Sequence, residues 1–332
     1  MDSAFFVFLF HAAMKSRPNI TSIIRAAIKT IKVVQADIAS HIATDPDEAF
    51  SPVQMTRTGK HLLTIDKIAE ARAQVTLRIE LKRKKDELQF LGEEQLDPNE
   101  NVHDLRDEDR LVVLVDMIDG TDLLARNLSN WCSAMVFLDP QADSGDKILA
   151  AFVGVPNDGI YYACRNHDFP YKYQFNASNR KSRHISLVKR TVSDVDDIAN
   201  ATVCFYGQKC SRVSTIMKTP FFDELPEKSR FYTIAGNPMM IKMIRQEYSP
   251  VDAVFDIHGQ WPHDVVAGAY IAIKAGAVYS PIGSSLNSIK HLEEGLLRPN
   301  DKNRKLRYVL ASTERLSRQL NHMLRKKDSV PS

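Results

Sequence analysis

The chain has 332 residues, of which 44% are hydrophobic, and a formal net charge of +3. This length and apolar fraction suffice for a large core in one or two subdomains. Because acids and bases are nearly balanced, a dedicated nucleic-acid-binding protein is not expected. The four cysteines show neither metal-ligand spacing nor a nearby histidine cluster, so we expect no zinc and a reduced, cytoplasmic protein.

A short apolar segment lies at the N-terminus, residues 4–10. It is similar to part of a signal peptide, but Asp2 stands where basic residues are usual, and the segment is too short to span a bilayer. We therefore expect it to pack on the domain or on a second subunit, with secretion as the alternative. No membrane partner is expected.

Apolar residues predict the order of the elements. From Ile23 to Ile42 they recur at helical intervals and predict an amphipathic helix that ends before Asp45; a second long helix is expected over about 67–85. Residues 131–164 contain three apolar runs separated by tight turns, which is typical of an antiparallel meander. Strands then alternate with helices. The chain is therefore predicted to be an α+β layered protein with two subdomains, 1–184 and 185–332.

Two carboxylates follow the most apolar strand candidate. Residues 111–115 are all Leu or Val, and Asp116, Asp119, Gly120 and Thr121 come directly after them. Ligands bind at such strand ends in open α/β sheets. Carboxylates this close repel each other unless a cation neutralises them, and oxygen ligands suit Mg²⁺ or Mn²⁺. The alternative is an Asx-type turn that simply closes the strand.

Further acids occur in two other short motifs. Gly92 is followed by Glu93 and Glu94, and Asp264 ends the segment Trp261-Pro262-His263-Asp264 ahead of a small-residue helix that reaches Ala275-Gly276. Together with the Asp116–Thr121 motif, these residues resemble the signatures of the inositol monophosphatase family, in their usual order. That family belongs to a superfamily of Mg²⁺-dependent, lithium-sensitive phosphatases that includes fructose-1,6-bisphosphatase and bisphosphate nucleotidase. The resemblance covers roughly residues 20–320.

The resemblance implies an α-β-α-β-α sandwich, a homodimer and a site for two or three Mg²⁺ ions. The implied metal ligands are Glu93, Asp116, Asp119, Asp264 and the carbonyl of Ile118. Thr121, paired with Glu93, would orient and deprotonate the attacking water, so Glu93, Asp119 and Thr121 are the catalytic candidates. The candidates for substrate binding are Asp119, Gly120, Thr121, Gly236, Asn237, Asp256 and Asp264. Asp66 and His263 are possible additions, with a helix N-cap and a structural histidine as their alternatives.

The sequence departs from the family pattern in ways that affect the substrate. Met117 replaces a proline, Ala277 replaces a glycine, and Pro262-His263 intervene between Trp261 and Asp264. We expect a phosphomonoesterase that acts on inositol monophosphate or a related small sugar phosphate. A 3′(2′),5′-bisphosphate nucleotidase or fructose-1,6-bisphosphatase is the first alternative, and the candidates for contacting a second phosphate are Lys209, Arg212 and Lys242. An inactive metal-binding scaffold is the alternative from another class.

Overall fold

The computed structural model describes residues 19–55, 61–83, 87–96, 103–128, 130–176, 181–187, 192–207, 210–244, 250–284 and 286–325. The apolar N-terminal segment and Lys209 lie outside these ranges. None of the described helices combines the length and apolar character needed to cross a membrane. All four cysteines are free thiols.

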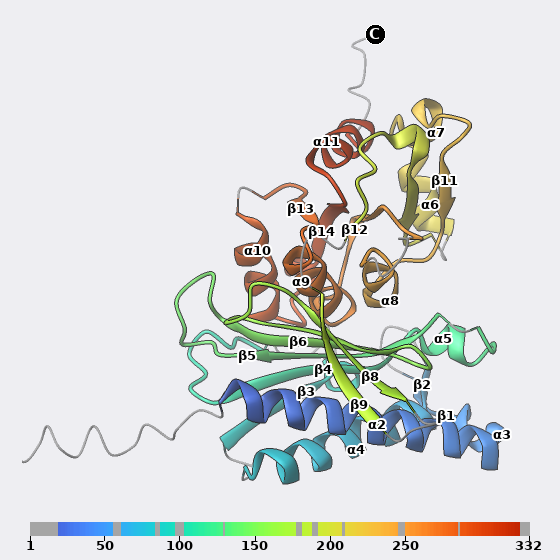
Figure 1. Ribbon diagram of the computed structural model, residues 1–332. Coiled ribbons are helices and arrows are strands. Elements are labelled where there is room, and N and C mark those ends of the chain that lie inside the picture. The colour runs from blue at the N-terminus through green and yellow to red at the C-terminus, as the bar shows by residue number, and fades with distance from the viewer. Residues whose placement is uncertain are drawn as a thin grey trace, which may run out of the picture.

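The chain forms five layers (Figure 1). Helices α2 (Ile20–Thr44) and α4 (Thr64–Leu81) cover the outer face of a seven-stranded sheet. A second group of helices separates this sheet from a five-stranded sheet, and a third group covers the far side of the smaller sheet. This order confirms the predicted α+β sandwich.

The seven-stranded sheet has its strands in the order β3-β4-β5-β6-β7-β8-β9. β3 (Leu88–Gly92) and β4 (Leu111–Asp119) are parallel, and all other neighbours are antiparallel. The predicted meander forms β5 to β7. The remaining strands are β5 (Cys132–Leu138), β6 (Ile148–Val155), β7 (Gly159–Cys164), β8 (Tyr171–Asn176) and β9 (Lys181–Ser186).

Helix α2 shows how periodicity becomes packing. The side chain of Asn19 caps the helix by accepting the Ser22 N–H at 2.8 Å. Ile23, Ile31 and Ile38 are fully or almost fully buried on the face toward α4 and β6. α4 ends earlier than predicted, at Leu81, because Lys82 adopts a left-handed φ of 52°.

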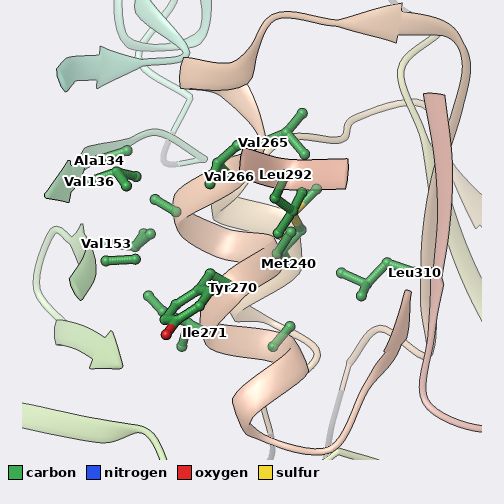
Figure 2. Close-up of a cluster of buried hydrophobic side chains, with 14 of the residues drawn as sticks. Ala134, Val136, Val153, Met240, Val265, Val266, Tyr270, Ile271, Leu292 and Leu310 are labelled. Atoms are coloured by element: carbon green, nitrogen blue, oxygen red, sulfur yellow. The ribbon is translucent and has the colours of Figure 1, made fainter. Parts of the chain in front are cut away.

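The central helical layer joins the two sheets into one core. It contains α8 (Asn237–Ile241), α9 (Val266–Lys274) and α10 (Ser288–Leu296). Figure 2 shows Val266 and Tyr270 of α9 between Val153 of the larger sheet and Leu310 of the smaller one. Because α9 is apolar around its circumference, it is buried on both sides.

The five-stranded sheet has the order β11-β10-β12-β14-β13, with β10 parallel to β11 and β12, and β14 antiparallel to β12 and β13. Its strands are β10 (Thr202–Phe205), β11 (Arg230–Tyr232), β12 (Ala253–Gln260), β13 (Val278–Pro281) and β14 (Leu306–Ala311). Beyond it lie α6 (Cys210–Ile216), α7 (Phe221–Glu224) and α11 (Glu314–Met323). The shorter elements are α3 (Pro46–Ala49), β1 (Pro52–Met55), β2 (His61–Leu63), η2 (Glu93–Gln95), α5 (Thr121–Leu124), η3 (Ile198–Asn200), η4 (Pro262–Asp264) and η5 (Lys302–Arg304).

β9 continues to Ser186, two residues past the predicted subdomain division at 184/185, and this division stays a prediction. β12 continues to Gln260, so Asp256 lies within the strand. Because β14 pairs along the length of β12, the polar residues after Asp256 remain part of the sheet.

Candidate active site

The end of β4 carries the first two acids of the candidate site. Asp116 pairs with Ala134 and Asp119 with Cys132, so the two intervening residues of β4 oppose Ser133 alone. Ser133 Oγ stabilises this irregularity by donating to the Met117 carbonyl at 2.8 Å, and the Ile118 N–H donates to Asp116 Oδ1 at 3.1 Å. The strand therefore continues through the acids with a bulge, whereas the sequence suggested that it ends at Asp116.

Acids from distant parts of the chain converge on this bulge. Asp116, Asp119 and Asp264 each offer a carboxylate oxygen, and these atoms all lie within 4.8 Å of one another. Glu93, His263 and Asp264 form a second group by the same measure. Asp264 belongs to both groups. The end of β4, the 3-10 turn η2 that carries Glu93, and η4 that carries Asp264 therefore meet at one place.

The carboxylates of this cluster destabilise one another when no cation is bound. Burial raises the pKa of Asp119 well above its usual range, and the charges of Asp264 and Glu93 raise it further. Burial also raises the pKa of the Cys132 thiol, and the negative charge of Asp119 adds to this effect. The cluster is thus a strongly negative environment at the junction of the two sheets.

The donor set fits a divalent cation. Carboxylate oxygens are the ligands that Mg²⁺ and Mn²⁺ prefer, and a cation would remove the repulsion that raises the Asp119 pKa. The residues that could hold it are Glu93, Asp116, Asp119 and Asp264. The Ile118 carbonyl lies next to them, 2.9 Å from Thr121 Oγ1.

Thr121 contacts an acid of helix α4. Its Oγ1 lies 2.8 Å from Asp66 Oδ1, and its pairing with Glu93 stays a prediction. The other oxygen of Asp66 accepts the Leu63 N–H at 3.2 Å, at the first turn of α4. Asp66 therefore caps its helix and reaches the end of β4, and its part in metal binding stays a prediction.

Two glycines hold backbone conformations that other residues rarely adopt. Gly120 has φ +102°, and Gly236 has φ +98° with its Cα facing the Asp119 carboxylate and the Asp264 carbonyl. After Gly236, the backbone N–H of Asn237 donates to Asp119 Oδ2 at 3.2 Å. The start of α8 is thereby attached to the acidic cluster.

His263 lies between the two acids of the second group. Its Nε2 is 3.5 Å from Asp264 Oδ1 and 3.8 Å from Glu93 Oε1. Its Nδ1 is buried and has no hydrogen-bond partner among the described residues. The imidazole thus faces Glu93 and Asp264, and its part in the site stays a prediction.

Two predicted substrate contacts have other partners. The Asn237 side chain is fully buried, donates to the His263 carbonyl at 2.8 Å and accepts the Gly268 N–H at 2.7 Å. Asp256 is also buried; its Oδ2 accepts from Arg212 at 2.7 Å and its Oδ1 from the Gly259 N–H at 2.5 Å. The role of Asn237 and Asp256 in substrate binding stays a prediction.

Two residues near the cluster, Glu70 and Lys305, were missed from the sequence. Glu70 is buried and lines a small crevice together with Asp66, Glu93 and Asp116. Its position four residues after Asp66 on α4 could have indicated this, because such residues share a helix face. Lys305 and the Arg212–Asp256 ion pair adjoin the Asp264 side of the site. They are brought there by tertiary packing that no local pattern reveals.

Lys242, a sequence candidate for contacting a second phosphate, is exposed in the turn after α8.

Comparisons with solved structures agree with this architecture. No family model and no curated protein sequence matches the chain. The extragenic suppressor protein SuhB from Bartonella henselae is similar in structure, with a TM-score of 0.60, 16% identity, and coverage of 93% of this chain and 98% of that chain. An IMPase from Thermotoga maritima gives a TM-score of 0.57 at 14% identity, with 91% and 95% covered. SaIMPase-II with bound inositol monophosphate gives 0.57 at 16%, with 91% and 93% covered.

These similarities extend over nearly the whole of each chain. The protein therefore has the inositol monophosphatase fold.

Proposed function

We propose that this protein is a Mg²⁺-dependent phosphomonoesterase. The observation that carries the proposal is the convergence of Asp116, Asp119 and Asp264 from both halves of the chain. Beside them, a threonine hydroxyl is held by a buried aspartate. Bound Mg²⁺ would supply positive charge for the phosphate oxygens and make an attacking water more acidic.

The chain's own residues would position the reactants. Because the Thr121 hydroxyl can donate to Asp66, its oxygen could take a proton from water while its own proton passes to the Asp66 carboxylate. Asp66 is held in turn by the Leu63 N–H. Gly120 has no side chain to keep a phosphate group away from the backbone. Glu93 and His263 would complete the site on the side of Asp264.

The substrate we propose is inositol monophosphate or a related small sugar phosphate. Two solved structures of SaIMPase-II support this choice, because one contains inositol monophosphate and another contains 2′AMP. We further propose two or three bound ions, inhibition by lithium, a homodimer and a cytoplasmic location. Light scattering of the purified protein with and without Mg²⁺ tests the dimer.

The direct experiment measures phosphate release from inositol, sugar and nucleotide phosphates, with and without Mg²⁺, and with added Li⁺. We expect Mg²⁺-dependent release that Li⁺ suppresses. Asp119→Asn should abolish it almost entirely, whereas Asp122→Asn, with an exposed side chain three residues away, should not. No release by folded, Mg²⁺-saturated protein would contradict the proposal and favour an inactive scaffold.

A further inference from the structure

An ion pair lies where the sequence suggested an acceptor for a substrate hydroxyl. Arg212 Nη1 contacts Asp256 Oδ2 at 2.7 Å, and the exposed fractions of the two side chains are 19% and 2%. The Arg212 guanidinium also stacks on Tyr206, 4.4 Å from the ring centroid. Arg212 therefore balances the charge of Asp256, and both carboxylate oxygens of Asp256 already accept hydrogen bonds within the protein.

A second cation, Lys305, is held close by. Its Nζ lies 4.1 Å from the centroid of Trp261, the residue that precedes η4 and its Asp264. Its backbone adjoins β12, since Leu306 pairs with Gln260. Within the described part of the chain, no carboxylate lies within 4.0 Å of Lys305 Nζ. The lysine is therefore held by an aromatic ring and has no anionic partner there.

Arg212 and Lys305 face the same region. Asp256 pairs with Arg212 and accepts the Gly259 N–H, and Gly259 packs directly against Cβ of Lys305. Lys305 also lies over Trp261, three residues before Asp264 of the candidate metal site. Two cations on aromatic supports therefore border the Asp264 side of the site.

We propose that Arg212 and Lys305 form a subsite for a second anionic group on the alcohol portion of the substrate, either a phosphate or a carboxylate. This inference rests on the proposed phosphomonoesterase function and narrows its substrate class. A small sugar or nucleoside ester with a distal negative charge would bind Lys305 without having to displace a carboxylate from it. Arg212 would contribute its remaining N–H donors.

A different role for Lys305 makes a different prediction. If the lysine only balanced the charge of Asp264, its removal would affect every phosphate ester equally. If it binds a distal anion, its removal would affect esters that carry such a group. The comparison therefore needs substrates that differ in that group alone.

The experiment compares kcat/KM for glucose 1-phosphate with kcat/KM for glucose 1,6-bisphosphate and glucuronate 1-phosphate. Adenosine 2′-phosphate and adenosine 2′,5′-bisphosphate form a nucleoside pair. A bisphosphate has two ester groups, which alone would raise its kcat/KM by a factor of about two. If the subsite binds the distal anion, we expect kcat/KM to be higher by roughly tenfold or more for the esters that carry one. The preferred ester distinguishes a phosphate from a carboxylate and a sugar from a nucleoside.

Lys305→Gln should reduce this preference about tenfold, mainly through KM. Lys302→Gln is the matched control, because Lys302 is exposed and lies three residues earlier in the chain. The double variant Arg212→Gln/Asp256→Asn should also reduce the preference, and it leaves neither charge of the pair buried alone. An equal loss for all esters in Lys305→Gln, or no preference in the wild-type protein, would overturn the inference.

Binding separates this inference from the proposed function. In EDTA, where no Mg²⁺ supports turnover or holds a phosphate at the acidic cluster, calorimetry with glucose 6-phosphate measures affinity for the distal anion. Lys305→Gln should weaken this affinity about tenfold while Lys302→Gln does not. An absence of turnover for every ester would contradict the phosphomonoesterase proposal. Glucose 6-phosphate binding that is absent, or unaffected by Lys305→Gln, would overturn the subsite.

Discussion

Thr121 Oγ1 lies 2.8 Å from Asp66 Oδ1, which joins the start of α5 to the first turn of α4. The two residues are 55 positions apart in the chain. Because Asp66 is buried and also accepts the Leu63 N–H, its carboxylate is held in one orientation. Helix α4 therefore fixes the position of a hydroxyl group at the end of β4.

Loss of the Thr121 hydroxyl should affect catalysis more than folding. We expect Thr121→Val to lower kcat by about 10²-fold or more, because proton transfer by a positioned group contributes on this scale. Thr121→Ser keeps the hydroxyl and should retain most of the activity. Steady-state kinetics with thermal unfolding of each variant makes the comparison. Activity of Thr121→Val within about threefold of wild type would argue against this role.

Asp264 should be required for metal binding. Since its carboxylate belongs to both groups of converging ligands, Asp264→Asn should weaken Mn²⁺ or Mg²⁺ binding by tenfold or more, about 1.4 kcal/mol. Isothermal titration calorimetry measures the effect directly. The increase in Tm that added Mg²⁺ produces in the wild-type protein should also shrink. Asp122→Asn is the control; an equal loss in that variant would show that net charge, not ligation, is responsible.

Gly92 leaves the space that the Glu70 carboxylate occupies. A Cβ at Gly92 would overlap the Glu70 side chain, which must then move within the crevice beside Glu93. We expect Gly92→Ala to lower the free energy of unfolding by about 1–3 kcal/mol and to reduce activity. Urea unfolding measures the first effect. If the overlap is the cause, Glu70→Ala in the Gly92→Ala background should recover stability, and no recovery would point to another cause.

A half-buried histidine should make the protein less stable in acid. His291 Nδ1 lies 2.9 Å from the Tyr279 hydroxyl, and burial lowers the His291 pKa from 6.5 to about 4. Between these pH values the unfolded chain binds a proton that the folded protein does not. Stability should therefore fall as the pH decreases from 6.5 toward 4.

His291→Asn keeps an acceptor for Tyr279 and removes the titrating ring. The Tm of this variant should depend less on pH between 6.5 and 4 than the Tm of the wild-type protein. His322→Asn, at an exposed position of α11, should leave the dependence unchanged. An identical pH dependence in all three proteins would rule out His291 as the cause.

Local sequence patterns predicted the elements and the central acids. Helix α2 is buried on one face, which requires apolar residues at helical intervals, and β4 is buried on both faces, which requires an uninterrupted apolar run. Both patterns are visible in neighbouring residues of the sequence. Asp116 and Asp119 share one strand end. The pairing of Thr121 with Asp66 and of Arg212 with Asp256 depends on packing between elements far apart in the chain. Since many acids could meet each hydroxyl or guanidinium group, neither pairing follows from spacing.

The shared helical layer has a consequence for folding. Val266 and Tyr270 of α9 pack in the same core as Val153 and Leu310, which belong to different sheets. A fragment that ends after β9 would therefore expose the apolar inner face of its sheet to water and tend to aggregate. Unfolding should be a single cooperative transition in which both sheets separate from α9 together. The protein should thus lose its acidic cluster and its core in one event.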